Sequence, residues 1–263
     1  NFKKFFNEFN AQSFVAPIIY KDTIVIGVMS GKVNAYDLDS GKFKWTFNLR
    51  KNNDFFEGAN PWGGIASDNK RGIVYISVGN PKPSRLGDKR TGRNKYSNSL
   101  VALNIENGKL LWDFQETRHD LWNLDIASPP NLINIKINDK NIDVVVVATK
   151  LGNTLILDRL TGKPIFDFRL KKVINSTNSN NWNFQPSLTI PEPFTRQVFK
   201  YDDISNISND SYEYVSKIVQ KSNYGFFQDF EINKPTIFYG IHGGAQWTGA
   251  SIDPRDSSLY ITS

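Results

Sequence analysis

AYDLDSGKFKW, residues 35–45, is the first of three copies of a pattern that returns as ALNIENGKLLW (102–112) and LILDRLTGKPIF (155–166). In each copy a polar residue precedes a glycine by four positions, and a large aromatic residue follows that glycine by four. The pattern predicts a strand, a turn closed by glycine, and a second strand whose terminal aromatic docks on a neighbouring unit. The aromatic residues are Trp45, Trp112 and Phe166.

A second repeat interleaves with the first. WGGIASD (62–68) and WTGASID (247–253) each precede a turn and a short strand-like run. Short strands, regular turns and glycine and aromatic residues that recur at intervals of tens of residues are typical of β-propellers. A propeller blade takes roughly 40–45 residues, so this chain holds about four blades and one insertion. We therefore predict an all-β fold in which residues 1–263 form a single partial β-propeller domain.

Strand signals fade between residues 171 and 235, where asparagine and serine are abundant. We predict an insertion between blade strands here, with one short helix at residues 208–221. Ser208 is suited to cap the helix. Apolar side chains recur at helical spacing and predict a face that packs on the propeller rim; they are Tyr212, Val215, Ile218 and Val219.

The composition is that of a globular protein, because 39% of the 263 residues are hydrophobic. The chain has no cysteine, which excludes disulfides, thiolate metal sites and thiol nucleophiles. The longest apolar run, residues 144–148, is far below the ~20 residues that span a bilayer. Asn1 is not followed by a signal-peptide pattern, and the last residues read as a strand. We therefore expect a piece of a longer protein, with targeting or anchoring segments elsewhere.

The net charge of +6 could suit an acidic partner, but the basic residues are spread along the chain. One local cluster lies in a glycine- and proline-containing loop and comprises Lys82, Arg85, Lys89, Arg90, Arg93 and Lys95. We interpret this cluster as a solvated loop or the rim of a cofactor site, and we expect no nucleic-acid partner.

Ionisable groups concentrate in HDLWNLD, residues 119–125, and at Lys150 on the next apolar run. His119 and the carboxylates of Asp120 and Asp125 surround Trp122, a combination suited to general acid–base chemistry beside a flat aromatic surface. The alternative is a polar loop with a packed tryptophan, since clustered carboxylates also occur in structural networks.

Six motifs in order carry a resemblance to a known family: GANPWGGIASD, VYISVGNPKP, YSNSLVAL, HDLWNLDIASPP, ATKLGNTLILDRLTGKP and GGAQWTGASIDP. From about Ala16 onward the chain closely resembles the quinoprotein dehydrogenases, in particular the membrane-linked glucose, quinate and polyol branch. The resemblance implies an eight-bladed propeller that holds pyrroloquinoline quinone and a divalent ion, Ca²⁺ or Mg²⁺. It further implies oxidation of a sugar, polyol or other alcohol, a quinone electron acceptor, and a periplasmic location with any membrane anchor outside this sequence.

The resemblance also implies roles for single residues. Trp62 matches the tryptophan on which the family stacks its quinone, and blade docking is the alternative for this indole. Asn80 matches an amide ligand of the metal, or else stabilises a turn. Lys150 matches the cation that contacts the quinone oxygens, and a lysine at an exposed strand end is the alternative. Trp247 lies near the cofactor or docks a blade.

Two departures from the family pattern bear on activity. The family's catalytic aspartate follows the tryptophan of HDLWNLD, and here that position is Asn123. An amide cannot accept the proton of a substrate hydroxyl at neutral pH, so Asp125 or Asp120 would have to serve. In extended structure Asp125 shares a face with Asn123, whereas Asp120 does not. The second departure is the turn at residues 29–32, where relatives carry a longer acidic loop that helps to bind the metal.

Two functions are therefore open from the sequence. The first is a periplasmic dehydrogenase, which Trp62, Asn80 and Lys150 together favour. The second is a catalytically inactive propeller that serves as a binding scaffold, which Asn123 and the short turn favour. Fold alone does not distinguish them.

Overall fold

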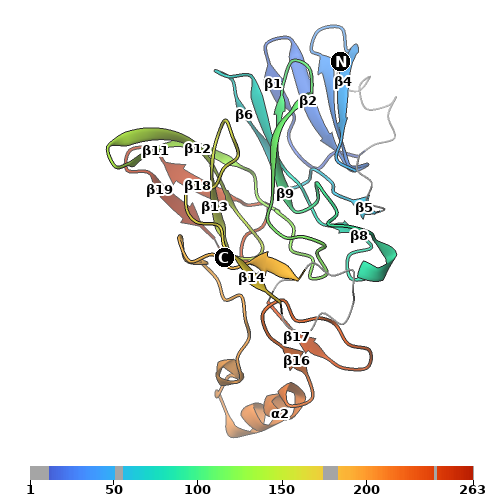
Figure 1. The fold of residues 1–263 in the computed structure, drawn as a ribbon, viewed down its shortest axis with the longest axis vertical. Coiled ribbons are helices and arrows are strands. Elements are labelled where there is room, and N and C mark those ends of the chain that lie inside the picture. The colour runs from blue at the N-terminus through green and yellow to red at the C-terminus, as the bar shows by residue number, and fades with distance from the viewer. Residues whose placement is uncertain (1–11, 51–55, 174–182, 240–241, 263) are drawn as a thin grey trace.

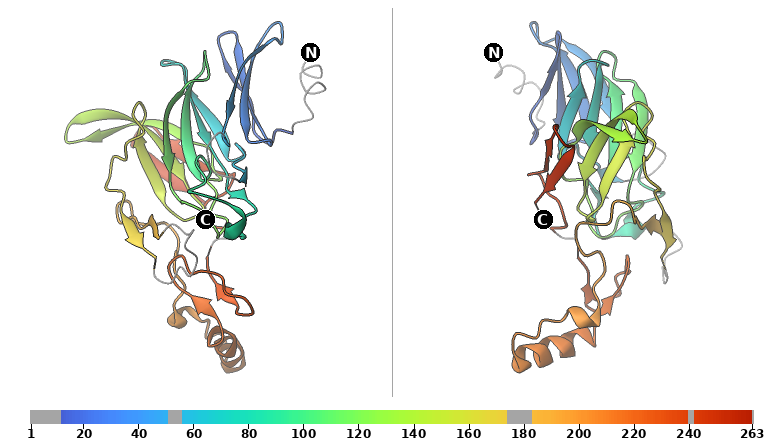
Figure 2. Two further views of the ribbon diagram at one scale, coloured as in Figure 1. Left: turned by 45° about the vertical axis from the view of Figure 1, so that its right-hand side comes forward. Right: turned by 90° about the vertical axis from the view of Figure 1, so that its left-hand side faces the viewer.

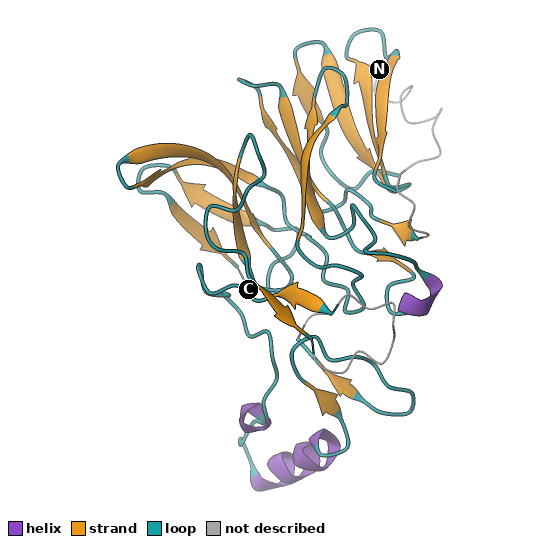
Figure 3. Cartoon of the chain, viewed as in Figure 1, coloured by secondary structure: helices purple, strands orange, loops and turns teal. Residues whose placement is uncertain are grey.

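A computed structural model describes residues 12–50, 56–173, 183–239 and 242–262, and most of its regular structure is β-sheet (Figures 1 and 3). The prediction of an all-β propeller with one short helix is confirmed. Antiparallel pairing dominates because the strands are joined by short turns. Within the described residues, no helix is long and apolar enough to cross a membrane.

Two four-stranded antiparallel sheets form the first two blades. Blade 1 has the order β1-β2-β3-β4, and its strands are Ile18–Tyr20, Thr23–Val28, Lys32–Asp37 and Phe43–Asn48. Blade 2 has the order β6-β7-β9-β10, and its strands are Gly64–Asp68, Ile73–Ser77, Ser99–Asn104 and Leu110–Gln115.

Blades 3 and 4 have fewer regular strands. Blade 3 pairs β11 (Asn131–Ile137), β12 (Lys140–Ala148) and β13 (Thr154–Asp158). Its expected outer strand is reduced to one bridge, Leu157 to Pro164, because a proline has no N–H to donate to a ladder. Blade 4 is the pair β18 (Ala250–Asp253) and β19 (Ser258–Ile261).

The remaining elements are short and connect the blades. Two-residue or three-residue strands form the pairs β5–β8, β14–β15 and β16–β17. The first pair joins β5 (Glu57–Gly58) and β8 (Pro81–Lys82). The second joins β14 (Leu170–Lys172) and β15 (Phe184–Pro186), and the third joins β16 (Asn223–Tyr224) and β17 (Thr236–Ile237). The 3-10 helices η1 and η2 span Gly87–Lys89 and Tyr201–Asp203.

The four sheets stand side by side in chain order, and their innermost strands contact one another (Figure 2). β6 lies between β1 and β11, and β11 contacts β18. These strands are the ones that begin each blade, so the chain enters every blade from the same central line. The loops that lead into β6, β11 and β18 consequently gather at one end of the blades.

Tryptophans of one blade dock on glycines of the next, as the repeat predicts. Trp45 Nε1 donates to the carbonyl oxygen of Ile105 at 2.8 Å, and a Cβ on Gly108 would lie 2.6 Å from the indole. Trp112 repeats this arrangement one blade further: a Cβ on Gly162 would lie 2.5 Å from its ring. Both glycines have positive φ, so the turn and the close indole each require the absence of a side chain.

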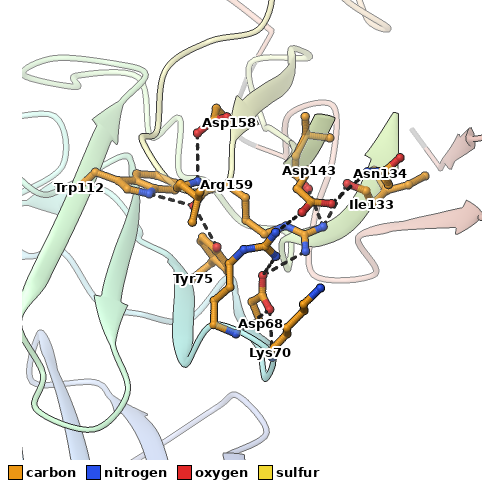
Figure 4. A network of polar contacts seen from close by, with 12 residues as sticks. Asp68, Lys70, Tyr75, Trp112, Ile133, Asn134, Asp143, Asp158 and Arg159 are labelled. Atoms are coloured by element: carbon orange, nitrogen blue, oxygen red, sulfur yellow. Dashed lines mark hydrogen bonds and ion pairs between the residues drawn. The ribbon is translucent and has the colours of Figure 1, made fainter. Parts of the chain in front are cut away.

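Arginine–carboxylate contacts join blades 2 and 3 next to the Trp112 dock (Figure 4). Arg159 donates to Asp68 at 3.1 Å, and its carbonyl oxygen accepts from Trp112 Nε1 at 3.1 Å. Arg71 contacts Asp68 at 2.7 Å and also binds Asp143. Burial alone would raise the pKa of Asp68, but hydrogen bonds from the two arginines outweigh burial and lower it.

The predicted helix is present as α2 (Asn209–Val219), at the end of the molecule far from blade 1 (Figures 1 and 2). Ser208 Oγ caps it by accepting from the amide of Ser211 at 3.2 Å. The predicted apolar face packs only in part, since Val219 is buried while Tyr212 and Ile218 stay exposed.

A buried glutamate holds the turn that follows β12. Glu116 Oε1 accepts from Thr149 Oγ1 at 3.0 Å and from Asn153 Nδ2 at 2.8 Å, and these two residues bracket Lys150. Burial raises the pKa of Glu116 to about 7 from its usual 4.5. A protonated, neutral side chain at this depth avoids the cost of a buried unpaired charge.

We predict that Glu116→Gln flattens the pH dependence of stability. Above pH 4.5 the unfolded chain loses this proton while the folded chain keeps it until about pH 7, so stability falls across that window. The loss is up to roughly 3 kcal/mol at about 1.4 kcal/mol per pKa unit. Urea unfolding at pH 4.5 and pH 8 measures it, with exposed Glu106→Gln as the control. Equal pH slopes in parent and variant would contradict the assignment.

We also predict that Gly162→Ala destabilises the protein more than Gly72→Ala does. Both glycines have φ near +68, namely +69 and +66, so both variants carry the backbone cost of about 1–2 kcal/mol. Only Gly162 faces an indole, and overpacking adds about 1–3 kcal/mol; the nearest atom to a Cβ on Gly72 is 3.2 Å away. Urea midpoints of the full-length variants test this difference, and equal midpoints would refute the docking account.

Candidate functional site

A cavity of about 360 Å³ opens where the loops leading into the innermost strands gather. Six sequence-predicted residues line it: Trp62, Asn80, Asn123, Asp125, Lys150 and Trp247. A larger and more open hollow of about 520 Å³ lies along residues 188–203 and contains none of them. The smaller cavity is the candidate site, because it collects the predicted groups.

Each of these groups lies in a segment that enters, leaves or connects blade strands. Trp62 precedes β6, Trp247 precedes β18, and Asn80 follows β7. Asn123 and Asp125 lie in the connection from β10 to β11, and Lys150 follows β12. All of these positions fall at the same end of the antiparallel sheets, which is why residues 62 to 247 meet in one place.

Asp125 is the centre of the site. Its Oδ1 accepts from Trp62 Nε1 at 3.0 Å and from the backbone N–H of Asn80 at 2.7 Å. Its Oδ2 pairs with Lys150 Nζ at 3.0 Å, and the residue is 2% exposed. Gly79 permits this packing, because a Cβ there would lie 2.3 Å from Trp62 Nε1. Three donors therefore converge on one buried carboxylate.

Lys150 is buried rather than exposed at a strand end. Its Nζ donates to the carbonyl oxygen of Asn123 at 2.8 Å as well as to Asp125. An ammonium has three N–H groups, so one donor of Lys150 is left for a ligand in the cavity that it lines.

Asn123 and Asn80 bond to each other across the cavity wall. Asn80 Nδ2 donates to Asn123 Oδ1 at 2.6 Å and to Ser84 Oγ at 2.9 Å. Asn123 has φ +64, a left-handed conformation that asparagine and aspartate tolerate better than most residues. The backbone turn and the amide contact together hold the Asn123 side chain toward Asn80.

Asp120 lies outside the cavity and organises the loop. It is fully buried and accepts from the amides of Trp122 at 2.8 Å and Leu124 at 2.7 Å, and from Asn98 Nδ2 at 3.0 Å. Burial raises the pKa of Asp120. His119 is buried as well and contacts the Gly92 carbonyl oxygen at 2.6 Å. The two acidic residues of HDLWNLD are thus separated, with Asp125 at the cavity and Asp120 behind it.

The tryptophans divide between cavity and core. Trp62 and Trp247 meet edge to face with ring centroids 6.0 Å apart, and Trp247 is 67% exposed. Trp122 instead packs edge to face on Phe227 of the insertion, with centroids 4.9 Å apart, and donates to the Gln228 carbonyl oxygen. The insertion therefore supports the site loop from behind.

The cavity lining also includes Asn60, which the sequence did not single out. Asn60 lies two positions before Trp62 within GANPWGGIASD, so its place in that motif was an available signal. Lys82 also lines the cavity; it is exposed and belongs to the basic cluster, for which the rim of a cofactor site was one of the two interpretations. Arg90 of the same cluster is buried instead, and its guanidinium donates to the Asp120 carbonyl oxygen.

The cavity fits a planar, anionic quinone better than it fits a divalent metal. It offers an indole in Trp62, a buried ammonium in Lys150 and a second cation in Lys82 at its rim. Its described lining has a single carboxylate, already bound by three donors. Among the described residues no group of three or more His, Cys, Asp or Glu could hold a metal ion.

Comparisons with known proteins agree with this fold. The family model of the glucose/ethanol/alcohol dehydrogenase β-propeller domain, a PQQ family, matches residues 7–263. The chain is similar to the quinoprotein glucose dehydrogenase A of Acinetobacter calcoaceticus, with 29% identity over 86% of this chain and 30% of that protein. It is also similar to the quinate/shikimate dehydrogenase (quinone) of Acinetobacter baylyi, with 30% identity over 94% of this chain and 34% of that protein.

A solved structure shows the same fold. The quinohemoprotein alcohol dehydrogenase of Comamonas testosteroni aligns with a TM-score of 0.63 and 21% identity, over 96% of this chain and 37% of that one. The chain spans about a third of the length of the relatives it matches. Because the family model covers nearly all of it, this chain belongs to the PQQ-dependent glucose, ethanol and alcohol dehydrogenase family, of which it forms part of the β-propeller domain.

Proposed function

We propose that the full-length protein oxidises a sugar, polyol or other alcohol with pyrroloquinoline quinone and passes the electrons to a quinone acceptor in the periplasm. The names of the relatives support this substrate class, since they include glycerol, glucose and quinate dehydrogenases. This chain spans only about a third of those proteins, so the remaining blades and the route of the electrons lie outside it.

One observation carries the proposal: Asp125 joins Trp62, Asn80 and Lys150 in a single cavity. A stacked cofactor needs an aromatic face, and a carbonyl oxygen that gains charge needs a fixed cation nearby. The bound quinone would supply a two-electron acceptor for the substrate's carbon-bound hydrogen. A scaffold needs docking tryptophans, but it does not need a buried lysine and carboxylate at the mouth of a cavity.

Among the described residues that line the cavity, Asp125 is the one whose carboxylate can take the hydroxyl proton. Its Oδ2 holds one donor, Lys150 Nζ, and so keeps a lone pair for a substrate hydroxyl. Asn123, at the family's aspartate position, cannot accept a proton at neutral pH. Lys150 orients Asp125 and offers its remaining N–H to the quinone or substrate oxygen, so proton removal and charge stabilisation occur within one hydrogen-bonded unit.

The inactive scaffold is the second candidate, and Asn123 is the observation that favours it. Its side chain is held by Asn80 at the place where the family has its base. In that case the Asp125–Lys150 pair would serve only to hold the β10–β11 connection against the turn after β12.

We predict that Asp125→Asn lowers kcat for quinone-dependent alcohol oxidation by roughly 10²–10⁴-fold, the usual contribution of a general base. Steady-state kinetics of the full-length protein measure the effect. Asp113→Asn is the control, because Asp113 pairs with Lys95 outside the cavity. An Asp125→Asn enzyme with parental kcat would place proton removal on another group.

We predict that Asn123→Asp raises the same kcat, by up to roughly 10²–10⁴-fold. Aspartate fits the left-handed backbone at this position, and its carboxylate can keep the hydrogen bond from Asn80 Nδ2. The Lys150 ammonium, bonded to the carbonyl oxygen of Asn123, stabilises the added charge. If the parent oxidises no alcohol and Asn123→Asp restores nothing, the scaffold is the better account.

A further inference from the structure

We infer that the cavity of this chain binds its quinone without a divalent metal ion, and that the Lys150 ammonium provides the positive charge instead. The inference rests on the proposed function, because it concerns how the same cavity holds pyrroloquinoline quinone. It follows from which oxygen atoms the cavity offers and from what those atoms already bind.

The carboxylate of Asp125 already accepts three protein donors, two at Oδ1 and the Lys150 ammonium at Oδ2. A calcium ion takes six to eight oxygen ligands at about 2.3–2.6 Å. A metal bound to Asp125 Oδ2 would share that oxygen with Lys150 Nζ, which lies 3.0 Å away. A metal bound to Oδ1 would displace the hydrogen bond from Trp62 Nε1 or from the backbone N–H of Asn80. A divalent ion at Oδ2 would also lie beside a buried ammonium, where like charges repel strongly.

The other oxygen atoms of the cavity wall are neutral. Asn123 Oδ1 already accepts from Asn80 Nδ2 at 2.6 Å, and amides add no charge to a site whose affinity depends on ligand charge. The turn at residues 29–32, which reaches the cavity through Met29, has the sequence MSGK and carries no carboxylate. Asp125 is thus the single acidic residue among the described residues that line the cavity.

Lysine can take over the electrostatic task of the ion. Lys150 is 4% exposed, so its charge acts through little water, and it has one N–H not used by Asp125 or Asn123. Its position is fixed from behind, since Glu116 bonds the residues on both sides of the turn. A fixed, buried ammonium in the cavity that Trp62 also lines can bind a quinone oxygen without first moving into place.

The experiment titrates the full-length protein with pyrroloquinoline quinone, once in EDTA and once in CaCl₂. Tryptophan fluorescence and the quinone absorption spectrum report binding, so no turnover is needed. We expect the two dissociation constants to agree within about twofold. A loss of about tenfold or more in EDTA that CaCl₂ restores would overturn the inference while leaving the proposed function intact. Absence of binding in both buffers would overturn the proposed function and this inference together.

Asn123→Asp gives an independent test, because it adds a second carboxylate next to the side-chain amide of Asn80. Calorimetry with CaCl₂ alone should show calcium binding by this variant with a dissociation constant of about 10⁻⁴–10⁻³ M, the range of weak protein sites. The parent should show none up to ~10 mM. Asn104→Asp is the matched control, since Asp37 and Asp158 hold the same place in the other repeats. A parent that binds calcium as tightly as Asn123→Asp refutes the inference.

Lys150→Gln tests the ammonium itself. Its quinone affinity in EDTA should fall by about tenfold or more, while a thermal melt checks that the variant is folded. The buried pair with Asp125 makes some loss of stability expected, because removing one partner leaves the other unpaired. A folded Lys150→Gln protein that binds quinone as the parent does would show that Lys150 does not supply the charge.

Discussion

The contact on which this structure depends is the indole of one blade lying over the glycine turn of the next. Trp45 over Gly108 and Trp112 over Gly162 use the same geometry, with each Nε1 bonded to a backbone carbonyl oxygen three residues before the glycine. The indole is large enough to bury substantial area and has one polar atom that needs a partner. A glycine turn provides both a flat surface and that partner, so blades 1 and 2 and blades 2 and 3 pack through the same kind of contact.

Regular blade spacing is what creates a functional end. Once β6, β11 and β18 follow one another around a common line, the loops that enter them must meet. Residues far apart in the chain then become neighbours because the blades stack, without any further signal in the sequence around each residue. The buried Glu116 adds precision, because it follows the last strand of blade 2 directly and bonds to both sides of the turn that carries Lys150.

The Asp125–Lys150 pair has a structural role and lines the candidate site at the same time. Burying two charges is costly, and the cost is offset only when geometry and additional hydrogen bonds are good. Here Trp62, Asn80 and the Asn123 carbonyl oxygen complete the pair. Breaking such a pair by removing one partner typically costs about 3–5 kcal/mol. The groups suited to proton transfer are therefore also ones that fix the β10–β11 connection.

The repeat, the contacts between blades and the capped helix can be predicted from the amino-acid sequence, because glycine spacing, aromatic positions and an N-cap serine act over a few residues. The sequence also named six of the cavity residues through their motifs. It did not determine which carboxylate of HDLWNLD faces the cavity, since Asp120 and Asp125 differ only in long-range partners. Tertiary structure decided this: the chain wraps its own amides around Asp120, whereas donors from residues 62, 80 and 150 converge on Asp125. Convergence over 25 to 63 residues depends on blade stacking, which no local pattern encodes.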